Sequence, residues 1–185
     1  MKYREIMREV RATKREIDIE TAKFPALVKH ATEVVRQRLA GLGIQDRFGV
    51  KIKGGTTSRF DQRWVGMYRG GTQFRGHGAI FWINANLPKI VAAGHDPDYD
   101  ASLAIETFNA ILTTLYHEYA HVIEEYARYH PDHMPELGQL IKASFADMED
   151  FTEEFGRWLG GSMSHHADTF GPIIRAWITV LTEAE

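Results

Sequence analysis

Residues 108–126, FNAILTTLYHEYAHVIEEY, contain the pattern that decides how this chain folds and what chemistry its centre can perform. Apolar side chains recur through this stretch at helical spacing: Phe108, Leu112, Leu115, Tyr119, Val122 and Tyr126. This periodicity predicts one long helix, from about residue 101 to residue 129. His117 and His121 lie on nearly the opposite side of that helix, one turn apart on the same face.

Two histidines at this spacing are typical of a zinc site. Both imidazoles can reach one tetrahedral metal, whose Zn–N bonds measure about 2.0–2.1 Å. Glu118 lies about 100° further round the helix, where it can take a proton from a water molecule that the metal activates. The pattern His-Glu-x-x-His therefore predicts a zinc-dependent hydrolase of peptide bonds. The alternative is a solvated helix face that carries two histidines without a function.

A catalytic zinc usually has a third protein ligand, which must come from elsewhere in the chain. Glu149 is a candidate because it lies at the edge of the apolar stripe of the next predicted helix, where a carboxylate can turn inward. Glu153, one turn later, could accept a hydrogen bond from a ligating histidine. His165 and His166 remain alternatives, either as the third ligand or as hydrogen-bond donors to the oxyanion of the reaction.

The remaining segments predict an α+β fold around this helix. Two N-terminal helices are expected within residues 1–45, the first containing Ile6, Val10 and Ile17 and the second running from about Pro25 to Leu39. Residues 46–88 predict a small, mainly antiparallel sheet, a meander of three strands: Phe48 to Lys53, Arg63 to Tyr68 and Gly78 to Asn84. Pro88 is expected in the loop that follows. After the zinc helix, two further helices are expected, from about Pro135 to Leu159 and from about Ser164 to the end, so that residues 100–185 hold the metal site.

The two motifs together resemble those of the gluzincin metallopeptidases. His117-Glu118-x-x-His121, followed by Glu149-Asp-Phe-Thr-Glu153, is similar to the zinc motifs of the lethal-factor-type group and of the phage-immunity peptidases that cleave repressors. The resemblance covers about residues 101–160. It implies a zincin-like fold with Glu149 as the third zinc ligand and Glu153 as support for a ligand histidine. It also implies that an edge strand beside the site, here the segment from Gly78 to Asn84, binds an extended peptide.

A second resemblance leads to a different third ligand. His166 followed by Phe170 is similar to the His-x-x-x-Phe segment of the SprT-like metalloproteases, in which the histidine binds zinc. An alternative of another class is a non-catalytic helical binding protein, such as a structural phage protein, that keeps or mimics the motif.

Composition limits the number of domains, the kinds of partner and the cellular compartment that we expect for this chain. The 185 residues fit a single domain, and 22 basic against 25 acidic residues give a net charge of −3. This balance gives no reason to expect nucleic acid or a membrane as a partner, so the expected partner is a peptide or protein substrate. The chain has no cysteine, which excludes disulfides, thiolate zinc ligands and a cysteine nucleophile. Without an apolar leader at its start, the chain is expected in the cytoplasm, although phage origin or export by another route would be compatible with the same sequence.

Overall fold

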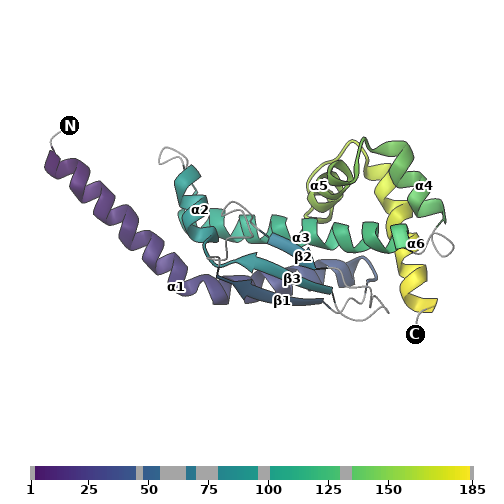
Figure 1. The fold of residues 1–185 in the computed structure, drawn as a ribbon, viewed down its shortest axis with the longest axis horizontal. Coiled ribbons are helices and arrows are strands. Elements are labelled where there is room, and N and C mark those ends of the chain that lie inside the picture. Colours follow the sequence, from purple (N-terminus) through teal and green to yellow (C-terminus); the bar gives the residue numbers. More distant parts are fainter. Residues whose placement is uncertain are drawn as a thin grey trace.

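The computed structural model describes residues 3–44, 48–54, 66–69, 79–95, 101–129 and 135–183. In chain order, the elements are α1 (Tyr3–Gly41), β1 (Phe48–Lys53), β2 (Gly66–Arg69), β3 (Ala79–Asn84), α2 (Leu87–Gly94), α3 (Leu103–Tyr129), α4 (Pro135–Ser144), α5 (Met148–Leu159) and α6 (Ala167–Glu183). The long helix α3 runs through the middle of the molecule, between the sheet and α5 (Figure 1). Helices α4, α5 and α6 gather towards its C-terminal end, and the N-terminal part of α1 extends away at the other (Figure 1). The protein is therefore α+β, as predicted.

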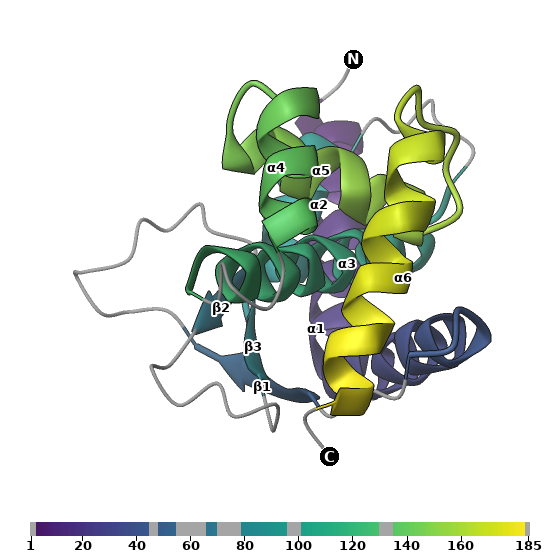
Figure 2. The same ribbon diagram turned by 90° about the vertical axis from the view of Figure 1, so that its right-hand side faces the viewer.

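Helix α3 is the central element of the core, and its predicted position is confirmed. Tyr119 is fully buried, and its hydroxyl oxygen accepts a hydrogen bond of 2.7 Å from Trp177 Nε1 of α6. Its ring also lies 6.3 Å from that of Phe48, centroid to centroid, at the start of β1. The side chain of Tyr119 thus contacts both the sheet and α6. Figure 2 shows α6 crossing α3. The helix that carries the two histidines is held from several sides.

The N-terminal region forms one helix, so the prediction of two helices was wrong. Pro25 lies inside α1 and is exposed. A proline in a helix costs about 3 kcal/mol because it removes one backbone hydrogen bond and crowds the preceding turn. Phe24 and Val28, on either side of it, are both buried, and this packing keeps the helix continuous past the proline. The helix ends at Gly41, two residues after its predicted end at Leu39. Just beyond it, Gly43 has a φ of 83°, which allows Ile44 N to donate to Leu39 O.

The sheet is mixed, and the prediction of a mainly antiparallel meander was wrong. Its strand order is β1-β3-β2, with β1 parallel to β3 and β2 antiparallel to β3. Strand β3 is the most apolar of the three, and Phe81 and Ile83 are fully buried in it. Because a central strand is covered and paired on both sides, β3 takes the middle position that a meander would give to β2. The predicted strand residues 63–65 and Gly78 lie outside the described residues.

The strand order also corrects the expected binding edge. Residues 79–84 form the central strand, whose backbone groups bond to β1 on one side and to β2 on the other. They cannot also pair with a peptide, so the edge strands are β1 and β2.

Two further predictions, the single helix from Pro135 to Leu159 and the loop at Pro88, were wrong because a helix begins at each of these places. The segment from Pro135 to Leu159 is two helices, because Asp147 caps α5: its carboxylate accepts from Asp150 N at 2.8 Å. The Asp150 carboxylate also accepts a hydrogen bond from Ala146 N, with Asp150 Oδ2 at 3.2 Å. These two hydrogen bonds hold the turn in which α5 begins, at Met148. Pro88, expected in a loop, lies in the first turn of α2, where a missing N–H costs little.

No helix within the described ranges combines the length and the apolar composition needed to cross a membrane.

Candidate metal centre

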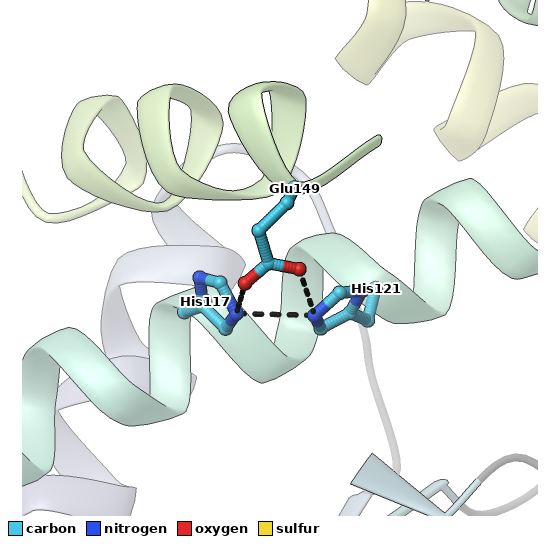
Figure 3. A group of neighbouring side chains, drawn as sticks. All are labelled: His117, His121 and Glu149. Carbon is cyan, nitrogen blue, oxygen red and sulfur yellow. Dashed lines mark hydrogen bonds and ion pairs between the residues drawn. The ribbon is translucent and has the colours of Figure 1, made fainter. Parts of the chain in front are cut away.

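His117, His121 and Glu149 converge where α5 crosses α3 (Figure 3). The Nε2 atoms of the two histidines lie 3.0 Å apart. Glu149 Oε1 lies 3.2 Å from His117 Nε2, and Glu149 Oε2 lies 3.7 Å from His121 Nε2. The ligand atoms of a tetrahedral zinc ion with bonds near 2.05 Å are roughly 3.3 Å apart, by geometry from the usual bond lengths. Two of the observed separations are shorter than that value and one is longer, and the two glutamate separations involve different carboxylate oxygens. The three side chains lie close enough together that they could hold one metal ion.

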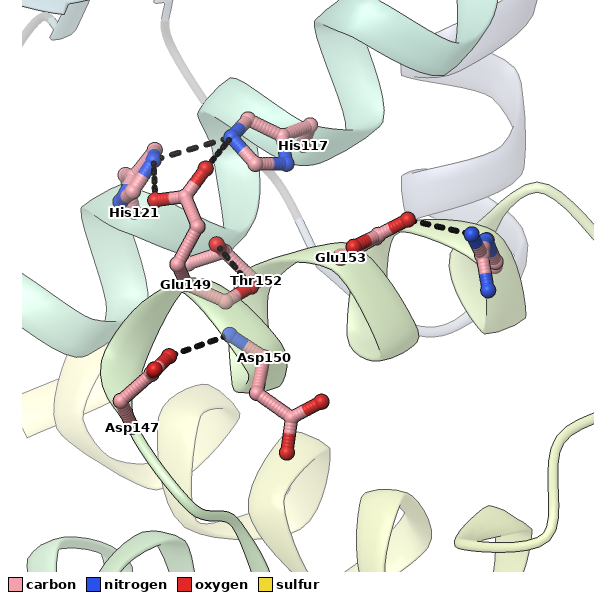
Figure 4. A network of polar contacts seen from close by, with 8 residues as sticks. His117, His121, Asp147, Glu149, Asp150, Thr152 and Glu153 are labelled. Atoms are coloured by element: carbon pink, nitrogen blue, oxygen red, sulfur yellow. Dashed lines mark hydrogen bonds and ion pairs between the residues drawn. The ribbon is translucent and has the colours of Figure 1, made fainter.

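The start of α5 is what brings Glu149 to the histidines. The Asp147 cap fixes the first turn of α5, and Glu149 extends from that turn towards α3 (Figure 4). Three residues on, the buried Thr152 donates its hydroxyl to Glu149 O at 3.0 Å. Because Glu149 belongs to a capped turn and not to an open loop, its backbone is held in place before any metal binds.

Close packing between α5 and α3 depends on a glycine that the sequence analysis missed. A methyl group on Gly156 would lie 3.0 Å from His117 N and 3.1 Å from His117 Cα. Gly156 lies seven residues after Glu149, on the same side of α5. A side chain at this position would force α5 and the backbone of a candidate ligand apart by a few tenths of an ångström, whereas glycine allows the close approach.

We therefore expect Gly156→Ala to destabilise the protein by about 1–3 kcal/mol, because the added methyl group meets backbone atoms that cannot move aside easily. Urea unfolding measures this change. Gly138→Ala in α4 is the matched control: nothing lies within 4 Å of its added methyl group, so alanine should raise stability by up to about 1 kcal/mol. If Gly156→Ala were as stable as Gly138→Ala, the close contact between the two helices would be wrong.

The two histidines are partly buried, while the carboxylate lies on the open side of the group. The side chains of His117 and His121 are 25% and 26% exposed, against 68% for Glu149. Burial lowers the pKa of His121, and the neighbouring His117 lowers it further, whereas Glu149 has the opposite effect. A lowered pKa favours the neutral imidazole, which is the form that binds a metal.

Glu118 lies between α3 and strand β2. It is 5% exposed, and a methyl group on Gly66 of β2 would lie 3.0 Å from its Oε1 atom. The same methyl group would lie 2.1 Å from Thr114 Cγ2. Glycine at position 66 therefore allows β2 to pass directly beside the predicted general base.

The structure does not bring the other predicted site residues to the group. Glu153 pairs with Arg157 along α5 and points away from the histidines (Figure 4). The His166 ring lies against Phe145, with the two centroids 4.7 Å apart, and His165 is exposed at the surface. Two further histidines of the sequence, His130 and His133, fall outside the described residues.

A charged pair one turn from the site is a second feature that the sequence analysis did not use. Glu124 is 5% exposed and pairs with Arg128. Burial raises the pKa of Glu124, and the ion pair with Arg128 opposes that shift. Arg128 in turn contributes to the lowered pKa of His121. The spacing of four residues between the acid and the base was the available signal.

Comparison with known proteins finds no relative of this chain. No family model, curated protein or solved structure matches the chain.

Proposed function

We propose that the protein is a zinc-dependent metalloprotease with a zincin-like site of the gluzincin type. His117, His121 and Glu149 bind the metal, and Glu118 is the general base. The observation that carries this proposal is the convergence of three side chains with metal-ligating atoms, from two separate helices, at separations close to those around one zinc ion. The same observation favours Glu149 over His166, because His166 lies against Phe145 and not within the group.

The proposed roles follow from the chemistry of each side chain. Two neutral histidines and one carboxylate hold a divalent ion with one unit of net positive charge remaining. Zinc in such a site would act as a Lewis acid that lowers the pKa of water, so that hydroxide is available near neutral pH to attack a carbonyl. Glu118 accepts the proton that the attacking water loses and can pass it to the leaving amine. Glu118 is buried beside β2, so its carboxylate has little room to move.

Strand β2 is the proposed binding edge for the substrate, in place of the segment from Gly78 to Asn84. Within the described ranges, β2 pairs with β3 alone, so its other side is available to an extended peptide. Because Gly66 packs against Glu118, a peptide bonded to β2 would lie beside the general base. The substrate class is therefore an unfolded or extended segment of a protein.

Zinc-dependent cleavage tests the proposed function. The protein is stripped with a chelator, divided, and one half is reloaded with zinc. Both halves are incubated with denatured casein, and mass spectrometry identifies new peptide ends. We expect new ends only with the reloaded protein. If neither half produces them and the reloaded half holds no zinc, the protease proposal is wrong and a non-catalytic binding protein takes its place.

A further inference from the structure

A groove between α1 and the edge strand β1 lies on a different part of the molecule from the metal centre. It has a volume of about 720 Å³ and lies between the middle of α1 and the outer part of β1. Val28, Val50 and Ile52 provide apolar surface in this groove, and Ile52 is 38% exposed. Val50 and Ile52 together offer apolar area that a partner could bury.

The backbone of β1 directs polar groups towards the same groove. Phe48 O accepts a hydrogen bond of 2.7 Å from Arg36 of α1, whereas Lys53 O accepts one of 3.0 Å from Ala85 N, next to β3. Backbone groups alternate in direction along a strand, so Val50 and Ile52 direct their N–H and C=O groups to the side of Phe48 O, away from β3. In the part of the chain that the structure describes, these two residues have no hydrogen-bond partner on that side.

Basic side chains line the groove and extend beyond it. Lys29, His30 and Arg36 line its α1 side, and Glu33 is the one acid among the lining residues that the structure describes. The wider charge distribution is strongly uneven: residues 1–84 hold 17 basic and 8 acidic side chains, whereas residues 85–185 hold 5 and 17. The net charge of −3 hides this separation. The part of the chain that forms α1 and the sheet attracts anions, although the chain as a whole is acidic.

We propose that the groove between α1 and β1 binds an extended peptide that carries alternating apolar and acidic side chains. The peptide adds a strand to the outer edge of β1 and bonds to the backbone of Val50 and Ile52. Its apolar side chains cover Val50 and Ile52, and its carboxylates lie near Lys29. An open strand edge and an apolar floor favour a peptide over nucleic acid, which would need stacking surfaces or a continuous line of cations. The site does not depend on the proposed zinc chemistry.

Fluorescence anisotropy with a labelled peptide of alternating valine and glutamate tests this site. The full chain is titrated in the presence of a chelator, so that the result does not depend on metal or on cleavage. We expect saturable binding, and we expect Lys29→Glu to weaken it at least about tenfold by reversing the nearest charge. Lys142→Glu makes the same charge change on the exposed surface of α4 and should leave the affinity within about twofold of the wild type.

A second variant tests the strand edge itself. Ile52→Pro removes the outward N–H and leaves the ladder with β3 intact, since proline is tolerated on the free side of an edge strand. It should abolish binding, whereas Ile52→Ala, which keeps the N–H, should retain part of it. Absence of saturable binding to the wild type would overturn the proposal, as would equal affinity for Ile52→Pro and Ile52→Ala. Tighter binding of a labelled oligothymidylate than of the peptide would replace the peptide with nucleic acid.

Discussion

The Glu118→Gln variant is expected to keep its zinc and lose activity by a factor of about 10²–10⁴. Glutamine has the size and shape of glutamate but cannot accept a proton from the attacking water. Glu118 is not among the three converging ligand residues, so metal binding should survive the change. Elemental analysis gives the zinc content of the variant, and the rate of release of casein peptides by the reloaded protein gives its activity.

A matched variant shows whether the effect belongs to this position. Glu16→Gln makes the same chemical change on the exposed surface of α1 and should leave both zinc content and rate unchanged. Full activity of Glu118→Gln would remove Glu118 from the mechanism. Loss of zinc from that variant would show that Glu118 takes part in coordination, contrary to the proposed roles.

Removal of Glu149, the proposed third ligand, is expected to have a large effect on metal affinity. We expect Glu149→Ala to weaken zinc binding by much more than the 10–100-fold that is typical of a residue acting through a ligand. Its carboxylate oxygens are 3.2 Å and 3.7 Å from the two histidine nitrogens, so no other acid of the described chain replaces it in that group. Competition with a fluorescent zinc chelator measures the affinity of each variant.

Two further variants separate the alternatives. His166→Ala should bind zinc as tightly as the wild type, because His166 lies against Phe145. Glu153→Ala should also bind normally if its partner is Arg157 alone, and 10–100-fold more weakly if it supports a ligand histidine. If Glu149→Ala kept the wild-type affinity while His166→Ala lost it, the gluzincin assignment would fail and the SprT-like one would replace it.

The sequence predicted those features that depend on local spacing. A stripe of apolar residues at helical intervals placed α3 correctly, since a buried helix must keep one face apolar over its whole length. The same spacing put His117 and His121 on one face. Glu149 was singled out because it lies at the edge of an apolar stripe, and that stripe packs onto α3 in the structure. Its role as a ligand remains a prediction.

The features that sequence did not predict depend on contacts between distant segments. Strand order was wrong because apolar content alone does not show which strands a central strand pairs with, and β3 pairs with both others. The break before α5 was missed although Asp147 and Asp150 carry a capping signal, because the apolar stripe continues across it. Gly156 was not noticed because a glycine in a helix reveals a close contact only when the opposing backbone is known. The close approach of β2 to Glu118 could not be predicted either, because Gly66 shows it only once the position of α3 beside β2 is known.

A zinc-anomalous difference map from crystals of the reloaded protein tests the central claim most directly. We predict one strong peak per chain, within about 2.0–2.2 Å of His117 Nε2, His121 Nε2 and one carboxylate oxygen of Glu149. A map without a peak at this group, from protein that elemental analysis shows to contain zinc, would contradict the account. So would a peak bonded to the two α3 histidines and to His166, with Glu149 turned away.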